Sequence, residues 1–315
     1  MLIDTSAACK LLIQNEDILI LTHQCPDGDT LGSAFALLWA LERLGKRARV
    51  ENPDALPERY RFIYGDYIPA DFTPRFVVAV DTANPSLLGA LEPVWDGRID
   101  LCIDHHKENT INSRYKLLDS ASPAAALLVY NIIKELGTGF DPKIATAVFT
   151  GLSTDTGCFL FYNVTAGTHR AAAEMIDCGA NHSLVNKLMF DTKSKARMEL
   201  DKTVLETLEY HFGGRCACIT VSEEATESLG ITEAELDGIS AIPRRIEGVI
   251  VGLTFREKPG GAYRVSVRTS GGLDASEICA VFGGGGHKNA GGCTITGTLA
   301  HVKEVVLREI EKVLS

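Results

Sequence analysis

The sequence predicts an α/β protein: an N-terminal domain built on a parallel sheet with flanking helices, a helical linker, and a smaller α+β domain at the C-terminus. Two observations lead to this prediction. The chain has 315 residues, twice the ~150 residues of a typical domain. Its first half alternates short apolar runs with longer helical patterns, which is typical of parallel strands joined by crossover helices. We place the domains at residues 1–190 and 212–315, and the linker at 191–211.

The N-terminal strands are predicted from short runs rich in β-branched and other apolar residues. They cover residues 18–22, 48–51, 76–80 and 101–103. Helical patterns cover residues 31–44, 143–152, 167–178 and 184–189. A further helix is predicted from Ser122 onward. Ser122 is a good N-cap, Pro123 suits the first helical position, and Gly137 suits the stop after the last turn.

The C-terminal half begins with a charged helical pattern over residues 191–210, which we expect to carry the chain into the second domain. Strands are predicted at residues 216–221, 248–256 and 262–269, and helices at 275–282 and 302–314. The sequence KPGG at residues 258–261 separates the last two of these strands. Because it is rich in turn-forming residues, it predicts a β-hairpin there.

The composition limits the classes of partner. The net charge of −10 disfavours sequence-independent binding of long nucleic acid, since Lys and Arg supply most of that affinity. A small anionic substrate in a local basic pocket remains allowed. The sequence has neither a signal peptide nor an apolar run of ~20 residues, so we expect no membrane partner. Its nine cysteines include no CxxC pair, which predicts reduced thiols and a cytoplasmic location.

The stretch LTHQCPDGDTLGS places His23, Asp27 and Asp29 directly after the first predicted strand and before a helix. Ligands bind at this position in open α/β sheets. Imidazole and carboxylate together suit a divalent metal such as manganese better than a soft ion. An Asp-Gly-Asp sequence is also common in simple turns, so this motif alone leaves both interpretations open.

The next two predicted strands also end in residues that bind metals. RFVVAV is followed by Asp81, and DLCI is followed by Asp104, His105 and His106. A single acidic residue at such a place is often only a turn or cap residue. However, parallel strands deliver their carboxyl ends to one edge of a sheet. Three such strand ends with metal-type ligands therefore predict a metal site at that edge.

Two further motifs add to this picture. In TGLSTDTGCF, Asp155 alone would be a polar cap at a helix end, but with the other segments it completes a dinuclear site. In VFGGGGHKNAGGC, the glycines before His287 let backbone amides approach an anion, although a flexible loop is the alternative. Residues 241–292 hold seven Lys or Arg against four Asp or Glu. The second domain is therefore predicted to hold phosphate.

These segments, in this order, resemble the DHH phosphoesterase family. HQCPDGD resembles its first motif, Asp81 the second, the DHH of residues 104–106 the third, and TDTG with Asp155 the fourth. The segment GGGGHKNAGG resembles the signature of the DHH-associated C-terminal domain. Within the family, the chain is most similar to the short stand-alone subgroup of nanoRNase/pAp phosphatases.

The resemblance implies a centre of two divalent cations. Mn²⁺ is the expected ion at both positions, and Mg²⁺ and Co²⁺ are the alternatives. One cation would be held by His23 and Asp27, and the other by Asp29, His105 and Asp155, with Asp81 bridging both. His106 would face the substrate phosphate, and Asp104 would orient its neighbours. In the second domain, the nucleotide would be gripped across an interdomain cleft by His287, the amides near Gly285 and Gly286, and Arg268, with Arg264 as the alternative to Arg268.

The implied substrates are short RNA or DNA oligonucleotides and small nucleotides: 5′-phosphorylated dinucleotides cut to mononucleotides, and pAp converted to AMP. A homodimer is compatible with the resemblance. A cyclic or linear dinucleotide phosphodiesterase would use the same residues. Inorganic pyrophosphatases share the first-domain ligands, but the glycine-rich segment suits a nucleotide better. RecJ-like exonucleases need an additional domain for which the chain has little room, and a nucleotide sensor without activity should have lost a ligand.

Overall fold

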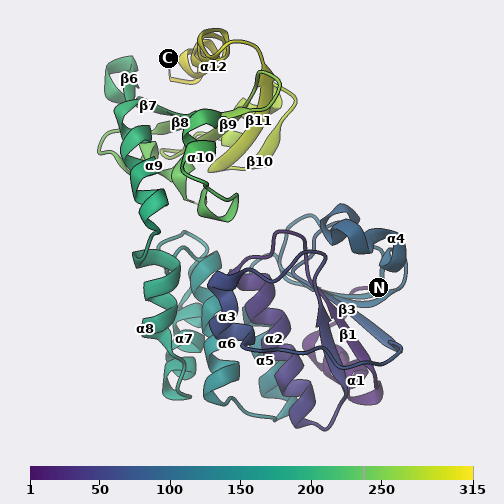
Figure 1. Cartoon of the computed structure of the whole chain (residues 1–315). Helices are drawn as coiled ribbons and strands as arrows, with labels where there is room; N and C mark the ends of the chain where they lie inside the picture. Colours follow the sequence, from purple (N-terminus) through teal and green to yellow (C-terminus); the bar gives the residue numbers. More distant parts are fainter. Residues whose placement is uncertain (237, 315) are drawn as a thin grey trace. The chain divides into compact units, whose positions relative to one another are not determined.

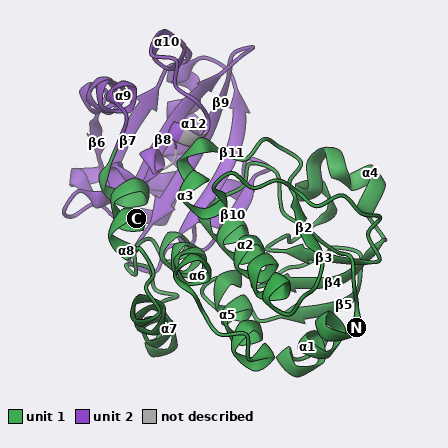
Figure 2. Cartoon of the chain, turned by 60° about the horizontal axis from the view of Figure 1, so that its bottom comes forward, with its two compact units in different colours: residues 1–192 green, residues 193–315 purple. Residues whose placement is uncertain are grey.

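The computed structural model describes residues 1–236 and 238–314 and divides into two compact units, Met1–Thr192 and Lys193–Ser315 (Figure 2). The segment predicted as a linker contains helix α9 (Lys195–Glu206), which packs within the second unit. Its Leu200 and Val204 are buried against Ile219 of strand β7 (Cys216–Val221). Among the described residues, no helix is both long and apolar enough to cross a membrane.

The first unit is built on a five-stranded sheet in the order β2-β1-β3-β4-β5, with every neighbouring pair parallel. Its strands are β1 (Ile18–Leu21), β2 (Ala48–Glu51), β3 (Phe76–Val80), β4 (Ile99–Asp104) and β5 (Ser113–Leu118). The parallel sheet confirms the predicted α/β class. Strand β5 was not predicted, because this edge strand is half-exposed and its sequence SRYKLL carries several polar residues.

Both faces of this sheet are covered, which explains why the central strands are apolar along their whole length. On one face, Ile18, Ile20 and Val78 pack in a core shared with several helices. Figure 1 shows α2, α5 and α6 beside the sheet. On the other face, Leu19 and Val77 pack against the 3₁₀ segment η2 (Pro85–Leu91) and its neighbour α4 (Glu92–Trp95). The helices of the first face are α1 (Thr5–Gln14), α2 (Gly28–Arg43), α5 (Ala125–Leu136) and α6 (Pro142–Asp155), followed by α7 (Ala166–Asp177) and α8 (His182–Asn186).

Helices α2 and α6 approach closely because glycine lies at their contact. A Cβ atom on Gly32 of α2 would lie 2.4 Å from the carbonyl oxygen of Ala147 in α6. A Cβ atom on Gly151 of α6 would lie 2.7 Å from Asp29 Oδ1. A larger side chain at either position would separate the helices, so these glycines set the distance between two elements that carry predicted ligands.

The prediction that Ser122 caps the following helix was wrong. Helix α5 begins at Ala125, and its N-cap position, Ala124, has no side chain that can accept a hydrogen bond. The amides of Ala125 and Ala126 donate instead to Asp29 Oδ2 and Oδ1, at 2.6 and 2.9 Å. A carboxylate from another helix therefore caps α5. The predicted stop at Gly137 is correct, with φ of 69°.

The second unit contains a six-stranded sheet in the order β10-β11-β9-β8-β7-β6. The predicted hairpin is present, because β8 and β9 are antiparallel and Lys258 pairs with Ala262. Helices α11 (Ala275–Ala280) and α12 (Leu299–Leu314) pack on one face, while α9 and α10 (Glu223–Ser228) lie on the other. The strands are β6 (Glu209–His211), β7 (Cys216–Val221), β8 (Val251–Lys258), β9 (Ala262–Thr269), β10 (Gly285–His287) and β11 (Ala290–Thr296).

The glycine-rich segment forms a strand pair and not a loop. Strands β10 and β11 are antiparallel, with Gly285 opposite Gly292 and His287 opposite Ala290. Glycine is required here because the backbone of α11 lies close to β11. A Cβ atom on Gly291 would lie 2.5 Å from the carbonyl oxygen of Ala275. The amides of Gly283 and Gly284 are already bonded to carbonyls at the end of α11, so they are not available to bind an anion.

Candidate metal centre

The carboxyl ends of three neighbouring strands deliver ligands to one edge of the first sheet. His23 follows β1, Asp81 follows β3, and His105 follows β4. Two helices supply the remaining carboxylates. Asp27 is the N-cap of α2, Asp29 lies in its first turn, and Asp155 is the last residue of α6. The structure thus brings all six predicted ligand residues together.

The six residues form two neighbouring groups of three, His23, Asp27 and Asp81 in one and Asp29, His105 and Asp155 in the other. In the first group, His23 Nε2 lies 3.8 Å from Asp27 Oδ1 and 3.7 Å from Asp81 Oδ2. In the second group, His105 Nε2 lies 3.8 Å from Asp29 Oδ2 and 3.3 Å from Asp155 Oδ2. Each group combines an imidazole with carboxylates at distances that leave room for one cation between the ligand atoms.

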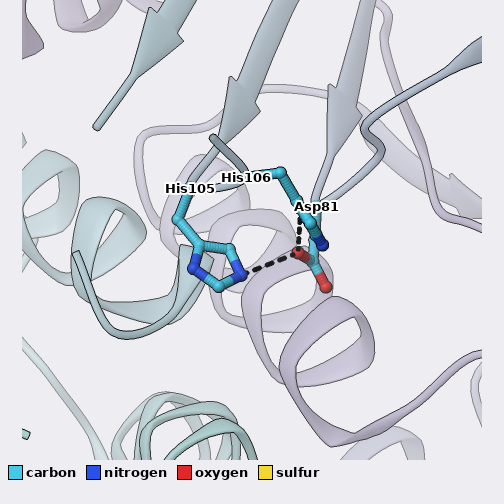
Figure 3. A group of neighbouring side chains, drawn as sticks. All are labelled: Asp81, His105 and His106. Atoms are coloured by element: carbon cyan, nitrogen blue, oxygen red, sulfur yellow. Dashed lines mark ion pairs between the residues drawn. The ribbon is translucent and has the colours of Figure 1, made fainter. Parts of the chain in front are cut away.

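Asp81 faces both groups with different oxygens. While Oδ2 points toward His23, Oδ1 lies 3.5 Å from His105 Nε2 (Figure 3). Oδ1 is buried and accepts no hydrogen bond from the described residues. The backbone of Asp81 is also strained, with φ of 55° in the left-handed region. An unpaired buried oxygen and such a backbone each cost about 1–3 kcal/mol. A bridging cation would satisfy this oxygen.

Burial and, after it, repulsion between carboxylates perturb the site when no cation is bound. Burial raises the pKa of Asp81 well above its ordinary value, and the neighbouring charge of Asp29 raises it further. Burial and the same neighbour raise the pKa of Asp155 to about 8. Burial alone would lower the pKa of His23, but Asp27 and Asp81 outweigh it and raise that pKa to about 11. Protons therefore occupy the cluster in the metal-free protein.

Hydrogen bonds hold both imidazoles with one nitrogen facing the cluster. His23 Nδ1 lies 2.7 Å from the carbonyl oxygen of Gln24, and His105 Nδ1 lies 3.2 Å from that of Ser122. A carbonyl accepts only from a protonated nitrogen, so in the neutral form of each ring the lone pair is on Nε2, which faces the cluster and could bind a metal ion. With four carboxylates, two imidazoles and no sulfur, the donor set fits divalent cations such as Mn²⁺ or Mg²⁺.

Asp104 is fully buried behind this centre and makes three hydrogen bonds. Its Oδ1 accepts from the amide of His105 and from His106 Nδ1, at 2.9 and 2.7 Å. Its Oδ2 accepts from Asn109 Nδ2 at 2.7 Å. Burial raises the pKa of Asp104, but the hydrogen bond from His106 and the other partners outweigh it and hold the pKa below its ordinary value. Asn109 was not predicted, because a lone Asn in a polar loop carries no sequence signal.

A second feature missed in the sequence is the apolar segment after Asp155. Leu160 and Tyr162 are 84% and 83% exposed, and the backbones of Cys158 and Phe159 have positive φ. The ring of Phe161 lies over Gly157, where a Cβ atom would be 2.4 Å away. The signal was the apolar run FLFY directly after TDTGC, which is unusual for an exposed turn.

In the second unit, the predicted substrate-binding residues lie on strands β10 and β9, which are separated by β11. His287 is opposite Ala290, and Ala290 is opposite Arg268, so the register places His287 and Arg268 in one row. Gly285, Gly286 and His287 are exposed. Arg264 lies on the same face of β9 but pairs with Thr294, at the other end of the strand.

Comparison with known proteins agrees with this geometry. The pattern of the DHH family, N-terminal domain, matches residues 17–152, and that of the DHHA1 domain matches residues 217–315. The bifunctional oligoribonuclease and PAP phosphatase NrnA of Thermus thermophilus is 36% identical over 306 residues, covering 95% of this chain and 90% of that protein. The chain belongs to the DHH family of phosphoesterases. As a DHH enzyme, it is a hydrolase that acts on phosphate esters.

Two other relatives show how widely the fold is shared. The cyclic-di-AMP phosphodiesterase PdeA of Listeria monocytogenes is 24% identical, covering 98% of this chain and 48% of that protein. The crystal structure of an exopolyphosphatase-related protein from Bacteroides fragilis superposes with a TM-score of 0.88 at 22% identity, covering 98% of this chain and 96% of that one. The fold of this DHH chain therefore has a close structural counterpart along nearly its whole length.

The raised pKa of Asp155 predicts how the metal-free protein responds to pH. Between its ordinary value of 3.8 and about 8, the folded state holds a proton that the unfolded state has released. The contribution of Asp155 to stability is therefore fully present below its ordinary pKa and is lost as pH rises through this range. His23, with its pKa raised from 6.5 to about 11, adds a loss in the same direction at higher pH. We expect Asp155→Asn to be more stable than the wild type by about 1–2 kcal/mol near pH 8.

Urea unfolding in the presence of EDTA, at about pH 5 and about pH 8, measures this difference. Asp71→Asn is the matched control, because Asp71 is exposed and belongs to neither ligand group. If the free energy of unfolding had the same pH dependence in the wild type and in Asp155→Asn, the raised pKa of Asp155 would be ruled out as its cause.

Proposed function

We propose that this DHH enzyme cleaves short 5′-phosphorylated oligonucleotides and dinucleotides to mononucleotides, and converts pAp to AMP. The observation that carries the proposal is the pair of ligand groups that meet at Asp81, whose backbone is strained and whose Oδ1 accepts no hydrogen bond from the described residues. The choice of substrate is supported by the Thermus relative, whose name assigns it both activities.

The proposed centre holds two divalent cations, with Mn²⁺ as the expected ion. His23 and Asp27 would hold one cation, Asp29, His105 and Asp155 the other, and Asp81 would contact both. Two such cations would supply an activated water and would stabilise the charge that develops at phosphorus. The protein's own contribution is to fix these ligands through the Asp29 bonds to α5 and the carbonyl contacts of the two imidazoles.

His106 is the proposed contact for the substrate phosphate. Its hydrogen bond to Asp104 raises the pKa of His106, which favours the imidazolium form. Its ring is partly exposed and lies 4.7 Å from the ring of His105, next to the proposed centre. A cation held at this position attracts a phosphate and stabilises the charge that develops on it.

In the second unit, Arg268 and His287 are the proposed contacts for the nucleotide, with the exposed strand at Gly285 and Gly286 beside them. Two other positively charged side chains of this region are held in ion pairs with a glutamate. Arg256 Nη2 donates to Glu233 Oε1 at 2.5 Å, and Lys258 Nζ donates to the same oxygen at 3.2 Å. Arg268 lies near the glycine strands instead, where Nη1 is 3.5 Å from the carbonyl oxygen of Gly291.

A cyclic or linear dinucleotide phosphodiesterase is the second candidate. It is supported by the similarity to PdeA, which covers nearly the whole of this chain. The ligand groups would serve both candidates, because each reaction is the hydrolysis of a phosphate ester. Only the substrate distinguishes the two candidates.

A substrate panel tests the proposal directly. The purified protein with Mn²⁺ would be offered pAp, pApA, pGpG, cyclic dinucleotides, RNA of graded length and pyrophosphate, and the products would be identified. We expect AMP from pAp and pApA, with rates falling as the RNA becomes longer. Faster hydrolysis of cyclic dinucleotides would favour the second candidate, and hydrolysis of pyrophosphate only, or of nothing, would contradict both.

Replacement of Asp81 should disable both cation positions at once. We expect Asp81→Ala to lower kcat by more than the ~10–100-fold typical of residues that merely orient ligands. Metal content and kcat would be measured on folded protein supplied with Mn²⁺, with Asp71→Ala as the control. Substantial turnover by well-folded Asp81→Ala would rule out the bridging role.

The two arginines of β9 should differ in their effect on substrate binding. Loss of a charge-assisted hydrogen bond to phosphate costs about 1.5–3 kcal/mol, so we expect Arg268→Ala to raise KM for pApA by roughly 10–100-fold. Arg264→Ala is the matched control, with the same charge change on the same face of the same strand. If Arg264→Ala gave the larger increase in KM, the assignment would pass to Arg264.

A further inference from the structure

Strands β6 and β7 of the second unit bring together a glutamate, a histidine and a cysteine. Glu209 is directly opposite Cys218 in the antiparallel register. His211 follows Glu209 on the same face of β6, because side chains alternate along a strand. Cys218 is buried, whereas the side chains of Glu209 and His211 are 47% and 28% exposed. The DHH motifs include none of these residues.

The three ligand atoms are spaced as a tetrahedral zinc ion requires. Cys218 Sγ lies 3.6 Å from His211 Nε2 and 3.7 Å from Glu209 Oε2. His211 Nε2 lies 3.6 Å from Glu209 Oε2. Tetrahedral zinc, with bonds of about 2.0–2.1 Å to nitrogen or oxygen and about 2.3 Å to sulfur, places its ligand atoms about 3.4–3.6 Å apart. One ion therefore fits between these atoms with little movement of the side chains.

Lys303 orients the carboxylate without occupying the site. Its Nζ donates to Glu209 Oε1 at 2.7 Å, which leaves Oε2 directed at His211 and Cys218. Such a bond to the outer oxygen is how proteins commonly fix a metal-binding carboxylate. With a thiolate, a carboxylate, a divalent ion and this ammonium group, the local charge is one positive unit, so the lysine does not prevent binding.

We propose that Glu209, His211 and Cys218 form a zinc site in the second unit. Cysteine, histidine and a carboxylate are the ligands that Zn²⁺ prefers, and the sulfur distinguishes this site from the all-oxygen-and-nitrogen centre of the first unit. The two exposed ligands leave a fourth position open to water. The ion links the three-residue edge strand β6 to β7.

Binding must displace the thiol proton. Burial and the charge of Glu209 raise the pKa of Cys218 to about 12, so the thiol is protonated without metal. When the ion binds, the S–H bond breaks, a sulfur–zinc bond forms, and one proton leaves to solvent.

Cobalt is the probe, because a thiolate bound to Co²⁺ gives a near-ultraviolet charge-transfer band that oxygen and nitrogen ligands do not give. The full-length protein, saturated with Mn²⁺, would be titrated with Co²⁺ and then with Zn²⁺. We expect a band that saturates at one cobalt per chain and disappears as zinc displaces it. Elemental analysis after dialysis should find one zinc per chain retained at this site.

Single-residue variants identify the side chains that bind the cobalt ion responsible for the band. We expect it to be lost in His211→Ala and in Cys218→Ser, and Glu209→Gln should weaken cobalt binding by about tenfold or more. His301→Ala and Cys25→Ser are the matched controls, since both residues are exposed and Cys25 lies beside the DHH ligands. His211→Ala changes a partly exposed residue, which keeps the test valid if Cys218→Ser fails to fold.

No band, or a band that persists in His211→Ala, would overturn the proposal. The Asp81→Ala protein should give the same band as the wild type. Because of this, loss of the phosphoesterase centre and absence of the zinc site produce different results.

Discussion

The hydrogen bonds between Asp29 and the start of helix α5 are the interaction on which the first unit depends. One carboxylate accepts the amides of Ala125 and Ala126 and still directs Oδ2 toward His105. The same side chain lies against Gly151 of α6, where no Cβ could fit. Asp29 therefore fixes the positions of α2, α5 and α6 while it serves the proposed metal centre, and the fold and the site cannot be optimised separately.

The electrostatics of the centre follow from this packing. The elements that bring Asp29, Asp81 and Asp155 to one edge of the sheet also bury these carboxylates, and this burial, with the charge of neighbouring carboxylates, raises the pKa of all three. A buried cluster of carboxylates of this kind is stable when it holds either protons or cations. The strained backbone of Asp81 is retained because the neighbouring strands and helices fix it from all sides.

Much of the first unit was predictable, because an apolar run followed by His or Asp marks both a buried strand and its functional end. Features that depend on distant parts of the chain were not. The cap of α5 comes from Asp29, which precedes Ala125 by 96 residues, so Ser122 was the best local candidate and was wrong. Glycines are rare in strands, so no strand was predicted at β10. The group around Cys218 has no CxxC spacing and became visible only when β6 paired with β7.

The proposed ligands of the first unit extend from His23, after β1, to Asp155, at the end of α6. A ribosome must therefore release about half of the chain before the last ligand is available, and Asp29 reaches its working position only when α5 docks. Partly synthesised chains cannot form the complete cavity. Metal acquisition then follows the folding of the first unit, and the finished ligand cluster, not the nascent chain, selects among the ions of the cell.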